Sequence, residues 1–574
     1  MADWGRTVRR YLPAVVLVVV IVVLGYFLTP QRPTTTPTPP PGEERPETTP
    51  PPELTTIPPL PQHPQIKVYF NYSQESVYAD PYRGMPKRYG YDLEDLIIKF
   101  IQSAQSSVDI AVQELNLPYI AQALVAQRNK GVRVRFITEN TYNRDWSQKL
   151  EDPQIDENDQ RNQAKLSEYR NLIDANQDGT ITEEELNTRD VYRILTRGGV
   201  PYIDDTADLS KGSNLMHHKF VVVDNKKVLM GSANFTLSDI HGDFGERNSR
   251  GNTNHLVIFD SPEIAKVYSE EFAILWGQGG GGGSKFGIQK PVRPTQVAKV
   301  GDATVGIHFS PFGRRVPWQE TTSGAIARAL RTATRRIDLA LFVFSDNELS
   351  RVLEDLHDNR GIEVRGLFDP GFANRDYSNT LEMWGIVLAP NCNFRPGRIP
   401  WRNPAQQVGI PRLHRTDKLH HKFGLIDDQV VVTGSHNWTE AANRGNDESI
   451  AIIASPVVAA HFKREFERML EGARFGPSQR LKERYEANKR ECGPPPPEML
   501  TQAQINVAAL DGVKLKININ TASAKELTQI PGIGPATAER IIAARPFASI
   551  EDLTRVRGIG PATLERIRDQ ITVN

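Results

Sequence analysis

The chain has 574 residues and equal numbers of basic and acidic side chains, 69 Lys and Arg against 69 Asp and Glu. This length exceeds what one hydrophobic core supports, so we expect several domains. The balanced charge excludes a global basic field, and any contact with nucleic acid or anionic lipid must therefore be local. The only cysteines, Cys392 and Cys492, exclude a disulfide framework and a cysteine-based zinc cluster, but are compatible with one bridge outside the cytoplasm.

The N-terminal segment predicts a membrane anchor. Arg6, Arg9 and Arg10 precede the apolar stretch 11–28, which as a helix would reach about 27 Å, close to the hydrocarbon thickness of a bilayer. The positive-inside rule places residues 1–10 in the cytoplasm and the rest of the chain in the periplasm or at the cell surface. A cleaved signal peptide is the alternative, although no small-x-small site closes the apolar stretch.

Three segments of biased composition divide the remaining chain. Residues 29–64 are rich in Pro and Thr and predict an extended stalk. Residues 277–300 begin with a glycine tract and predict a flexible linker, and the Pro-containing segment 476–513 predicts another. Between these segments we expect a first half at 65–276, a second half at 301–475 and a C-terminal module at 514–574.

The two halves repeat one order of elements. Helices are predicted at 93–103 and 326–334. Apolar strands are predicted at 66–70, 108–112 and 132–137 in the first half, and at 305–309, 337–344 and 362–368 in the second. Because strands alternate with helices, we expect an α/β fold with a parallel sheet in each half.

One motif occurs twice with identical spacing. His217-x-Lys219-x4-Asp224 is followed by Gly231-Ser232-x-Asn234, and the second copy reads His420-x-Lys422-x4-Asp427 and Gly434-Ser435-x-Asn437. Two matching sets predict duplicated domains. In each copy the His and Lys open a strand and Gly-Ser-x-Asn lies where the next strand turns, so these side chains should surround one cavity.

Such a pair of motifs suits phosphodiester chemistry. The negative charge of a phosphodiester repels nucleophiles, so a metal-free site needs cations and hydrogen-bond donors, here Lys219, Lys422, Asn234 and Asn437. One histidine can attack phosphorus and form a covalent phosphohistidine while the other protonates the leaving oxygen. We therefore expect that catalysis requires no metal and that neither half works alone.

These motifs resemble the signature of the phospholipase D superfamily, and the resemblance spans roughly residues 65–475. It implies two duplicated phospholipase D-like α/β sandwich domains, with His217 as nucleophile and His420 as general acid. Glu448 fits the place of a carboxylate that orients a catalytic histidine. The first half has Asn254 at the corresponding position, and an amide does not stabilise an imidazolium, so the two histidines should differ in pKa. Functional asymmetry is our interpretation, and degeneration to an inactive site is the alternative.

The first half contains an insertion at 155–200 that the second lacks. It resembles an EF-hand loop, with a glycine at the turn and six ligand positions at Asp174, Asn176, Asp178, Thr180, Thr182 and Glu185. We expect a structural Ca²⁺ there, and a chance acidic turn is the alternative.

The C-terminal module contains a second internal repeat. Two Gly-x-Gly turns, Gly532-x-Gly534 and Gly558-x-Gly560, each lead through Pro-Ala-Thr into a predicted helix. Such turns expose backbone N–H groups to a phosphate. The repeat resembles the paired helix-hairpin-helix domain of bacterial competence DNA receptors, which implies non-sequence-specific binding of double-stranded DNA. A module for protein contacts is the alternative.

Together these features predict a membrane-anchored, extracytoplasmic phosphodiesterase, most simply a DNA endonuclease. The alternatives are a phospholipase or phosphatidyl transferase, and a non-catalytic DNA-capture protein. Lipid turnover predicts an apolar mouth to the site, whereas DNA cleavage predicts basic walls, such as Arg412, Arg415 and Lys418 before the second motif.

Overall fold

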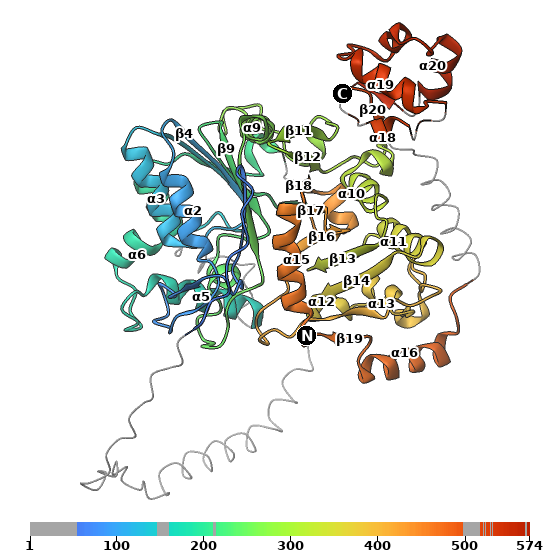
Figure 1. Cartoon of the computed structure of the whole chain (residues 1–574). Helices are drawn as coiled ribbons and strands as arrows, with labels where there is room; N and C mark the ends of the chain where they lie inside the picture. Colours follow the sequence, from blue (N-terminus) through green and yellow to red (C-terminus); the bar gives the residue numbers. More distant parts are fainter. Residues whose placement is uncertain are drawn as a thin grey trace, which may run out of the picture. The chain divides into compact units, whose positions relative to one another are not determined.

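The computed structural model describes residues 54–145, 148, 160–210, 214–496 and 517–573, the last range with gaps at 521, 523, 529, 531 and 569–570 (Figure 1). The predicted cytoplasmic residues 1–10, the predicted membrane segment 11–28 and most of the predicted stalk lie outside these residues. Among the helices of the described ranges, none is both long and apolar enough to cross a membrane.

The first half is built on a seven-stranded mixed sheet. Its strands, in spatial order, are β1 (Ile66–Phe70), β10 (His255–Asp260), β9 (Lys227–Gly231), β8 (Lys219–Val223), β4 (Ser107–Val112), β5 (Arg133–Thr138) and β6 (Tyr202–Asp204). The expectation of a parallel sheet is correct only for β4, β5 and β6. The other pairs are antiparallel. One reason is that β8 and β9 are joined by a short turn, which only antiparallel neighbours allow.

The second half repeats this arrangement in a ten-stranded sheet. Nine strands follow the order β11 (Gln296–Val300), β12 (Ala303–Ser310), β18 (Asn446–Ala454), β17 (Val430–Gly434), β16 (Lys422–Ile426), β13 (Arg336–Leu341), β14 (Glu363–Phe368), β15 (Gln407–Ile410) and β19 (Arg474–Phe475). The tenth, β7 (Leu215–Met216), comes from the first half and pairs in parallel with β18. The succession β18 to β15 matches β10 to β6, as duplication predicts.

Helices cover the sheets. In the first half they are α2 (Leu93–Gln102), α3 (Pro118–Asn129), α8 (Leu237–Ile240) and α9 (Pro262–Trp276). In the second half they are α10 (Thr322–Leu330), α11 (Asn347–Arg360), α12 (Pro370–Ala373), α13 (Asn379–Met383), α14 (Glu440–Arg444) and α15 (Pro456–Leu470). One core is common to both halves and contains Phe220 and Tyr268 together with Phe423 and Phe462. Separate cores lie under α2 and α3 and under α10 and α11. The shared core fixes the two halves against each other, which a site between them requires.

The described part of the insertion, residues 160–200, contains three helices, α5 (Gln160–Ile173), α6 (Glu183–Arg189) and α7 (Val191–Arg197). Tyr169, Ile173 and Leu186 make a small core between them. Thr182 begins α6 with a capping box in which its hydroxyl and the Glu185 carboxylate each accept a backbone N–H of the other residue.

Two of the predicted linkers contain ordered structure. In segment 277–300, β11 pairs with β12, and buried Lys290 forms ion pairs with Glu271 and Asp447. In segment 476–513, residues Gln479–Cys492 form the helix α16. The end of the predicted stalk also packs, since His63 is buried. Composition alone missed these elements because each is held by contacts with distant residues.

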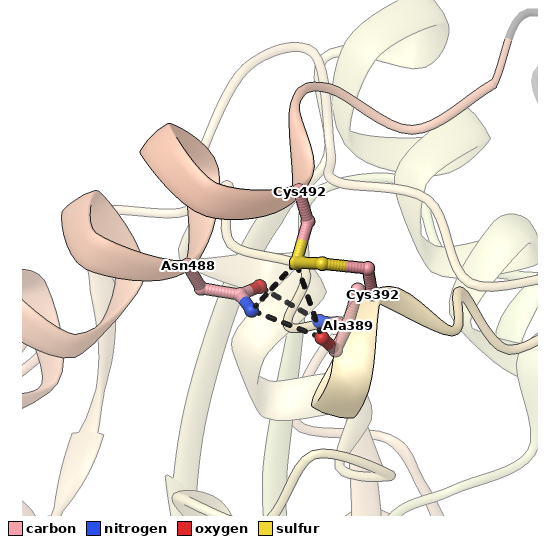
Figure 2. The surroundings of a disulfide bond; sticks show 4 residues. All are labelled: Ala389, Cys392, Asn488 and Cys492. Atoms are coloured by element: carbon pink, nitrogen blue, oxygen red, sulfur yellow. Dashed lines mark hydrogen bonds between the residues drawn. A yellow bond between two sulfur atoms is a disulfide. The ribbon is translucent and has the colours of Figure 1, made fainter.

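A disulfide joins Cys392 to Cys492, which are 100 residues apart (Figure 2). Beside it, Asn488 of α16 accepts a hydrogen bond from the Ala389 N–H at 2.8 Å and donates one to the Ala389 carbonyl at 2.9 Å. The bridge therefore anchors α16 to the second half.

The C-terminal module has its own core of small helices. They are α18 (Ala524–Leu527), α19 (Pro535–Ala543), the 3-10 turn η5 (Ile550–Arg555) and α20 (Pro561–Ile567), closed by the short parallel strands β20 (Ile517–Asn518) and β21 (Ile571–Thr572). The hairpin glycines Gly532 and Gly558 have φ of +93° and +103°, a conformation that favours glycine.

Candidate active site and nucleic-acid interface

The two catalytic motifs meet where the halves exchange short strand contacts. The His217 N–H donates to the Asp447 carbonyl at 2.9 Å, directly after the pairing of β7 with β18. In the matching contact, Leu419 bridges Thr253 of the first half. Each catalytic histidine therefore lies beside a strand of the other half, and the site requires both halves.

His217 is oriented by a carboxylate from the second half. Its Nδ1 lies 2.7 Å from Oε2 of Glu448, whose side chain is fully buried. A carboxylate only accepts, so Nδ1 carries the proton and Nε2 keeps a free lone pair. The structure thus places the Glu448 carboxylate against a histidine of the motifs, and this histidine is the one in the opposite half.

His420 is oriented by an amide from the first half. Its Nδ1 lies 3.0 Å from Oδ1 of Asn254. The Asn254 amide nitrogen donates to the backbone carbonyls of Asp239 and Asn252 at 2.9 and 3.3 Å, which fixes the amide with its oxygen toward His420. The neutral His420 ring thus has the same tautomer as His217, with an amide in place of the carboxylate.

Both lysines of the motifs are buried beside the histidines. The Lys219 ammonium donates to the Gln113 side chain at 3.1 Å and to the His217 carbonyl at 2.8 Å. Lys422 donates to the His420 carbonyl at 2.6 Å and lies over the Phe342 ring. Neither lysine is ion-paired with a carboxylate within the described part of the chain. Both are therefore placed to receive an anion.

Burial and the mutual repulsion of these cations favour the neutral forms. Burial, with Lys219 and Lys422 adding, holds the pKa of His217 well below its usual value, and the pKa of His420 is lowered in the same way. Burial also lowers the pKa of Lys219 to about 8 and that of Lys422 well below its ordinary value. A phosphodiester between these groups would reverse the shifts, because an opposite charge stabilises the protonated forms.

The asparagines of the two motifs have polar groups available to a ligand. The Oδ1 atoms of Asn234 and Asn437 are buried, and within the described ranges neither has a hydrogen-bond partner. Buried amide groups without partners are uncommon and often mark a ligand site. These oxygens accept hydrogen bonds, whereas a contact with a phosphate oxygen needs the amide nitrogens, so the predicted role of these side chains at phosphate oxygens stays a prediction.

Four other predicted site residues have structural roles. The Ser232 hydroxyl donates to Oδ1 of Asn254 at 2.8 Å, and the Ser435 hydroxyl accepts the Ser449 N–H at 3.0 Å. Asp224 and Asp427 lie at the opposite ends of β8 and β16 from the catalytic histidines. They accept backbone N–H groups of residues 105–107 and 334–336. The assignment of these two aspartates to catalysis is therefore corrected, since they fix turns.

Comparison with known proteins decides the family. A family model described as "Cardiolipin synthase, PLD-like domain" matches residues 97–276 and 326–470, more than half of the chain. The chain belongs to the phospholipase D superfamily. A second family model, the helix-hairpin-helix motif, matches residues 513–572.

Individual relatives of this phospholipase D chain span only part of it. The human mitochondrial cardiolipin hydrolase is 30% identical over 182 residues, which are 31% of this chain and 62% of that protein. Among solved structures, the phospholipase D family member Nuc from Salmonella typhimurium has 18% identity, covers 38% of this chain and 97% of its own, and has a TM-score of 0.22. Phosphatidylserine synthase from Haemophilus influenzae has 12% identity, covers 73% and 92%, and has a TM-score of 0.40. These scores are too low to carry an argument about substrate.

The EF-hand-like loop of this superfamily member has the predicted turn. Gly179 has φ +84°, and its N–H donates to Oδ2 of Asp174 at 2.9 Å. Glu185 accepts the Ala175 N–H at 2.9 Å and so reaches back to the beginning of the loop. Across the described residues, however, no three His, Cys, Asp or Glu side chains are grouped so that they could hold a metal ion. The oxygen donors suit calcium, and the calcium site stays a prediction.

Each hairpin turn of the C-terminal module lies near an arginine of the other hairpin. A methyl group at Gly558 would lie 3.3 Å from Nη2 of Arg540, and one at Gly532 would lie 3.7 Å from Nη2 of Arg566. Gly534 and Gly560 are the N-caps of α19 and α20. The sequence predicts a role for the four glycines, and the fold brings these two arginines beside two of them.

Residues that directly precede the second motif in the sequence line a basic pocket. It has a volume of about 330 Å³ and is lined by Pro370, Ile410, Pro411, Arg412, Leu413, His414, Arg415, Gly472 and Arg474. Arg415 pairs with Glu246. Arg412 and Arg474 are exposed, and within the described ranges neither guanidinium is paired with a carboxylate. Of the three basic residues expected to form a wall, Arg412 and Arg415 line this pocket and Lys418 does not, while Arg474 joins them from a strand far along the chain.

Proposed function

We propose that this protein is an endonuclease that cuts DNA at the site shared by its two halves and holds the duplex with its helix-hairpin-helix module. The observation that carries this proposal is the basic pocket beside the second motif. Its unpaired Arg412 and Arg474 offer charge to a phosphate next to the one being cleaved. Exposed Lys418 extends this charge toward His420, whose pKa it lowers.

The geometry supports a two-step displacement at phosphorus. Nε2 of His217 attacks, the N–P bond forms, and the bond from phosphorus to the leaving oxygen breaks as that oxygen takes a proton from Nε2 of His420. Water then gives a proton back to His420, and its oxygen displaces His217 from phosphorus. Lys219 and Lys422 neutralise the charge that develops on the non-bridging oxygens. Glu448 stabilises the positive ring of the phosphohistidine, which favours His217 as nucleophile.

The same site could serve a lipid phosphodiester. The similarity to mitochondrial cardiolipin hydrolase supports this alternative. The pocket beside the motif is lined by three arginines as well as by apolar groups, which fits a polyanion better than acyl chains. The helix-hairpin-helix module would also have no evident part in lipid turnover.

We further propose that the folded part works outside the cytoplasm, anchored by the N-terminal segment, with a structural calcium ion in the insertion. The Cys392–Cys492 disulfide supports an oxidising compartment.

Calcium should raise the unfolding temperature of the wild type and leave that of Asp174→Ala unchanged. An unfolding temperature that calcium does not alter in the wild type would remove the calcium proposal.

The deciding experiment compares plasmid DNA and fluorescent cardiolipin as substrates of the full chain in detergent, with and without EDTA. We expect DNA cleavage that survives EDTA and is lost in His217→Ala and His420→Ala. Arg412→Ala/Arg474→Ala should raise KM for DNA about tenfold or more. The matched control is Arg490→Ala, an exposed arginine of α16. Cleavage of cardiolipin alone would replace the nuclease by a lipid enzyme.

A further inference from the structure

The two halves place their acidic side chains at different positions around the site. Thr236 caps α8 by accepting the Asp239 N–H, and Thr439 caps α14 by accepting the Ala442 N–H, so Asp239 corresponds to Ala442. The serines of the two motifs donate their N–H groups to the carbonyls of His255 and Ser449. The residues before these two, Asn254 and Glu448, therefore correspond. The first half has an acid at 239 and an amide at 254, whereas the second has alanine at 442 and an acid at 448.

Asp239 lies beside His420, the histidine whose Nδ1 is hydrogen-bonded to an amide instead of a carboxylate. Its Oδ2 is 3.6 Å from Nδ1 of His420, and its side chain is only 4% exposed. The same oxygen accepts the Asn234 N–H at 2.7 Å, and Oδ1 accepts the Asn252 amide. At 3.6 Å the contact with His420 is a charge interaction and no hydrogen bond. Asn254 orients the ring, and Asp239 is the anion next to it.

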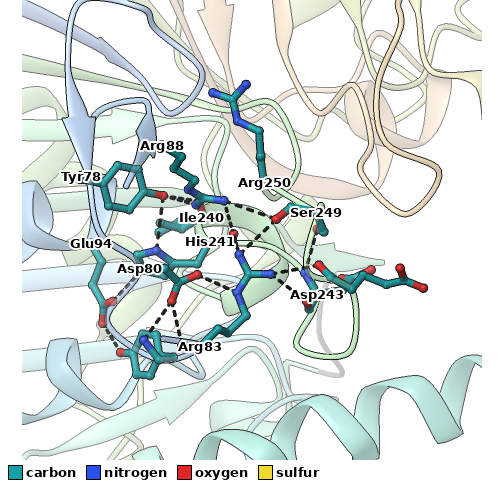
Figure 3. Close-up of polar contacts among 12 residues, drawn as sticks. Tyr78, Asp80, Arg83, Arg88, Glu94, Ile240, His241, Asp243, Ser249 and Arg250 are labelled. Carbon is teal, nitrogen blue, oxygen red and sulfur yellow. Dashed lines mark hydrogen bonds and ion pairs between the residues drawn. The ribbon is translucent and has the colours of Figure 1, made fainter. Parts of the chain in front are cut away.

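Arg83 and Arg88 form hydrogen bonds with the residues at the end of α8, directly after Asp239 in the sequence (Figure 3). Arg88 donates to the Ile240 and His241 carbonyls at 3.3 and 2.6 Å, and Arg83 also donates to the His241 carbonyl. The His241 ring is paired with Glu94 at 2.8 Å. Two cations on the last carbonyls of a helix also suit its dipole. This support keeps the Asp239 carboxylate fixed relative to His420.

We propose that Asp239 supplies to His420 the negative charge that position 254 has lost, and so acts as a positioning residue for the general acid. The proposal rests on the two-histidine chemistry described above and holds whether the substrate is DNA or lipid. Glu448 stabilises the positive ring of His217 by a direct hydrogen bond, and Asp239 stabilises the protonated ring of His420 through space. The amide at 254 is therefore no sign of an inactive half.

The charged groups that face His420 otherwise oppose its protonation. They are Lys422, Lys219, Lys418 and His217. Within the described ranges, Asp239 is the acid that forms an ion-pair contact with the His420 ring, at 3.6 Å. Its removal should leave a smaller fraction of His420 protonated and able to donate to the leaving oxygen, while the attack by His217 stays intact.

The test compares two esters that differ in their need for an acid. Thymidine 5′-(4-nitrophenyl) phosphate releases a stable phenolate, whereas a dinucleoside phosphate releases a sugar alkoxide that needs a proton. We expect Asp239→Asn to lower kcat for the dinucleoside phosphate about 30-fold or more and for the nitrophenyl ester less than about threefold. The alkaline limb of the pH–rate profile should move to lower pH, because without the neighbouring anion the protonated His420 ring has a lower pKa and loses its proton earlier.

The substitution Asn254→Asp tests whether a carboxylate at position 254 can replace Asp239, and it gives a second measurement if Asp239→Asn does not fold. Added to Asp239→Asn, it should restore dinucleoside cleavage; alone, it should move the alkaline limb to higher pH. Equal losses on both esters, without a pH shift or rescue, would overturn the proposal and leave Asp239 a packing residue. If Asp239→Asn does not fold, an unmoved pH limb in Asn254→Asp alone overturns it equally. Absence of all turnover in the wild type would instead count against the proposed phosphodiesterase function.

Discussion

Glu448 and Asn254 face the two catalytic histidines from opposite halves, and they differ mainly in charge. The carboxylate is 2.7 Å from His217 and the amide oxygen 3.0 Å from His420. Both fix the same ring tautomer, but only the carboxylate stabilises a positively charged ring through a direct hydrogen bond. This difference is the reason why we propose His217 for the covalent step.

Replacing Glu448 by Gln should therefore impair the covalent step. Gln keeps an acceptor for Nδ1 and removes the charge, so we expect kcat to fall about 100-fold even for the nitrophenyl ester. Steady-state kinetics would measure this, with Glu467→Gln, a half-exposed partner of Arg365, as matched control. A kcat within about threefold of the wild type would contradict the role of Glu448.

The buried lysines should lower the free energy of unfolding, because their charged forms are disfavoured in the folded protein. The pKa of Lys219 is about 8 in the folded protein, against an ordinary 10.5. The unfolded chain binds this proton more tightly, so the folded state is destabilised by about 3 kcal/mol below pH 8, and the deficit disappears as pH rises toward 10.5.

Lys219→Met should accordingly be inactive and more stable than the wild type at pH 7. The gain should be about 3 kcal/mol or less and should shrink at pH 9.5. Urea unfolding at both pH values would measure it, with exposed Lys226→Met as control. A loss of stability in Lys219→Met at pH 7 would show that the ammonium is already stabilised in the folded protein.

At the scale of elements, Asp224 and Asp427 connect the ends of β8 and β16, through hydrogen bonds, to the turns that lead into β4 and β13. Although partial burial opposes ionisation, backbone N–H donors from residues 105–107 lower the pKa of Asp224 to about 2. A carboxyl with a depressed pKa stabilises the fold above its ordinary value, near 4, and loses that effect as pH falls toward 2.

Asp224→Ala should cost about 1 kcal/mol, given the solvent exposure of this group, and leave kcat unchanged within about twofold. The loss of stability should vanish near pH 2. Thermal unfolding between pH 2 and 7, together with kinetics at pH 7, would check both statements. A large loss of kcat at unchanged stability would return Asp224 to the catalytic residues.

In the helix-hairpin-helix module, we expect two arginines to contribute to DNA binding. Arg540 and Arg566 lie beside Gly558 and Gly532 of the opposite hairpins. Replacing both by Ala should weaken DNA binding for every sequence alike and reduce the salt dependence by about one phosphate contact each. Fluorescence anisotropy in a salt series would measure this, with Arg568→Ala, which is paired with Glu551 and Glu565, as control. An unchanged salt slope would exclude the two arginines from the interface.

At the scale of the whole molecule, the sequence predicted the duplication, the α/β class and both histidine motifs. The repeat spacing was informative because strands and catalytic residues recur together. The spacing could not show that Glu448 contacts His217 of the other half, because this contact depends on the pairing of β7 with β18. Asp239 was missed for a similar reason: a lone aspartate in a short helix has no motif, and only the fold places it beside His420.

The disulfide stabilises the second half by closing a 100-residue loop. We expect Cys392→Ser/Cys492→Ser to lower the free energy of unfolding by about 2–4 kcal/mol, because an open chain gains entropy when it unfolds. Urea unfolding of the variant and of the reduced wild type should agree. An unchanged stability would mean that α16 is held by its other contacts alone.

The most direct test of the shared site is to trap its covalent intermediate. His420→Ala, mixed with thymidine 5′-(4-nitrophenyl) phosphate, should still release nitrophenol but lack the base for the water step, so the adduct accumulates. Mass spectrometry of the alkaline-quenched protein should find thymidine phosphate on His217, and Glu448→Gln in the same background should slow its formation. An adduct on another residue, or nitrophenol turnover by the wild type with no adduct in His420→Ala, would contradict the two-histidine mechanism.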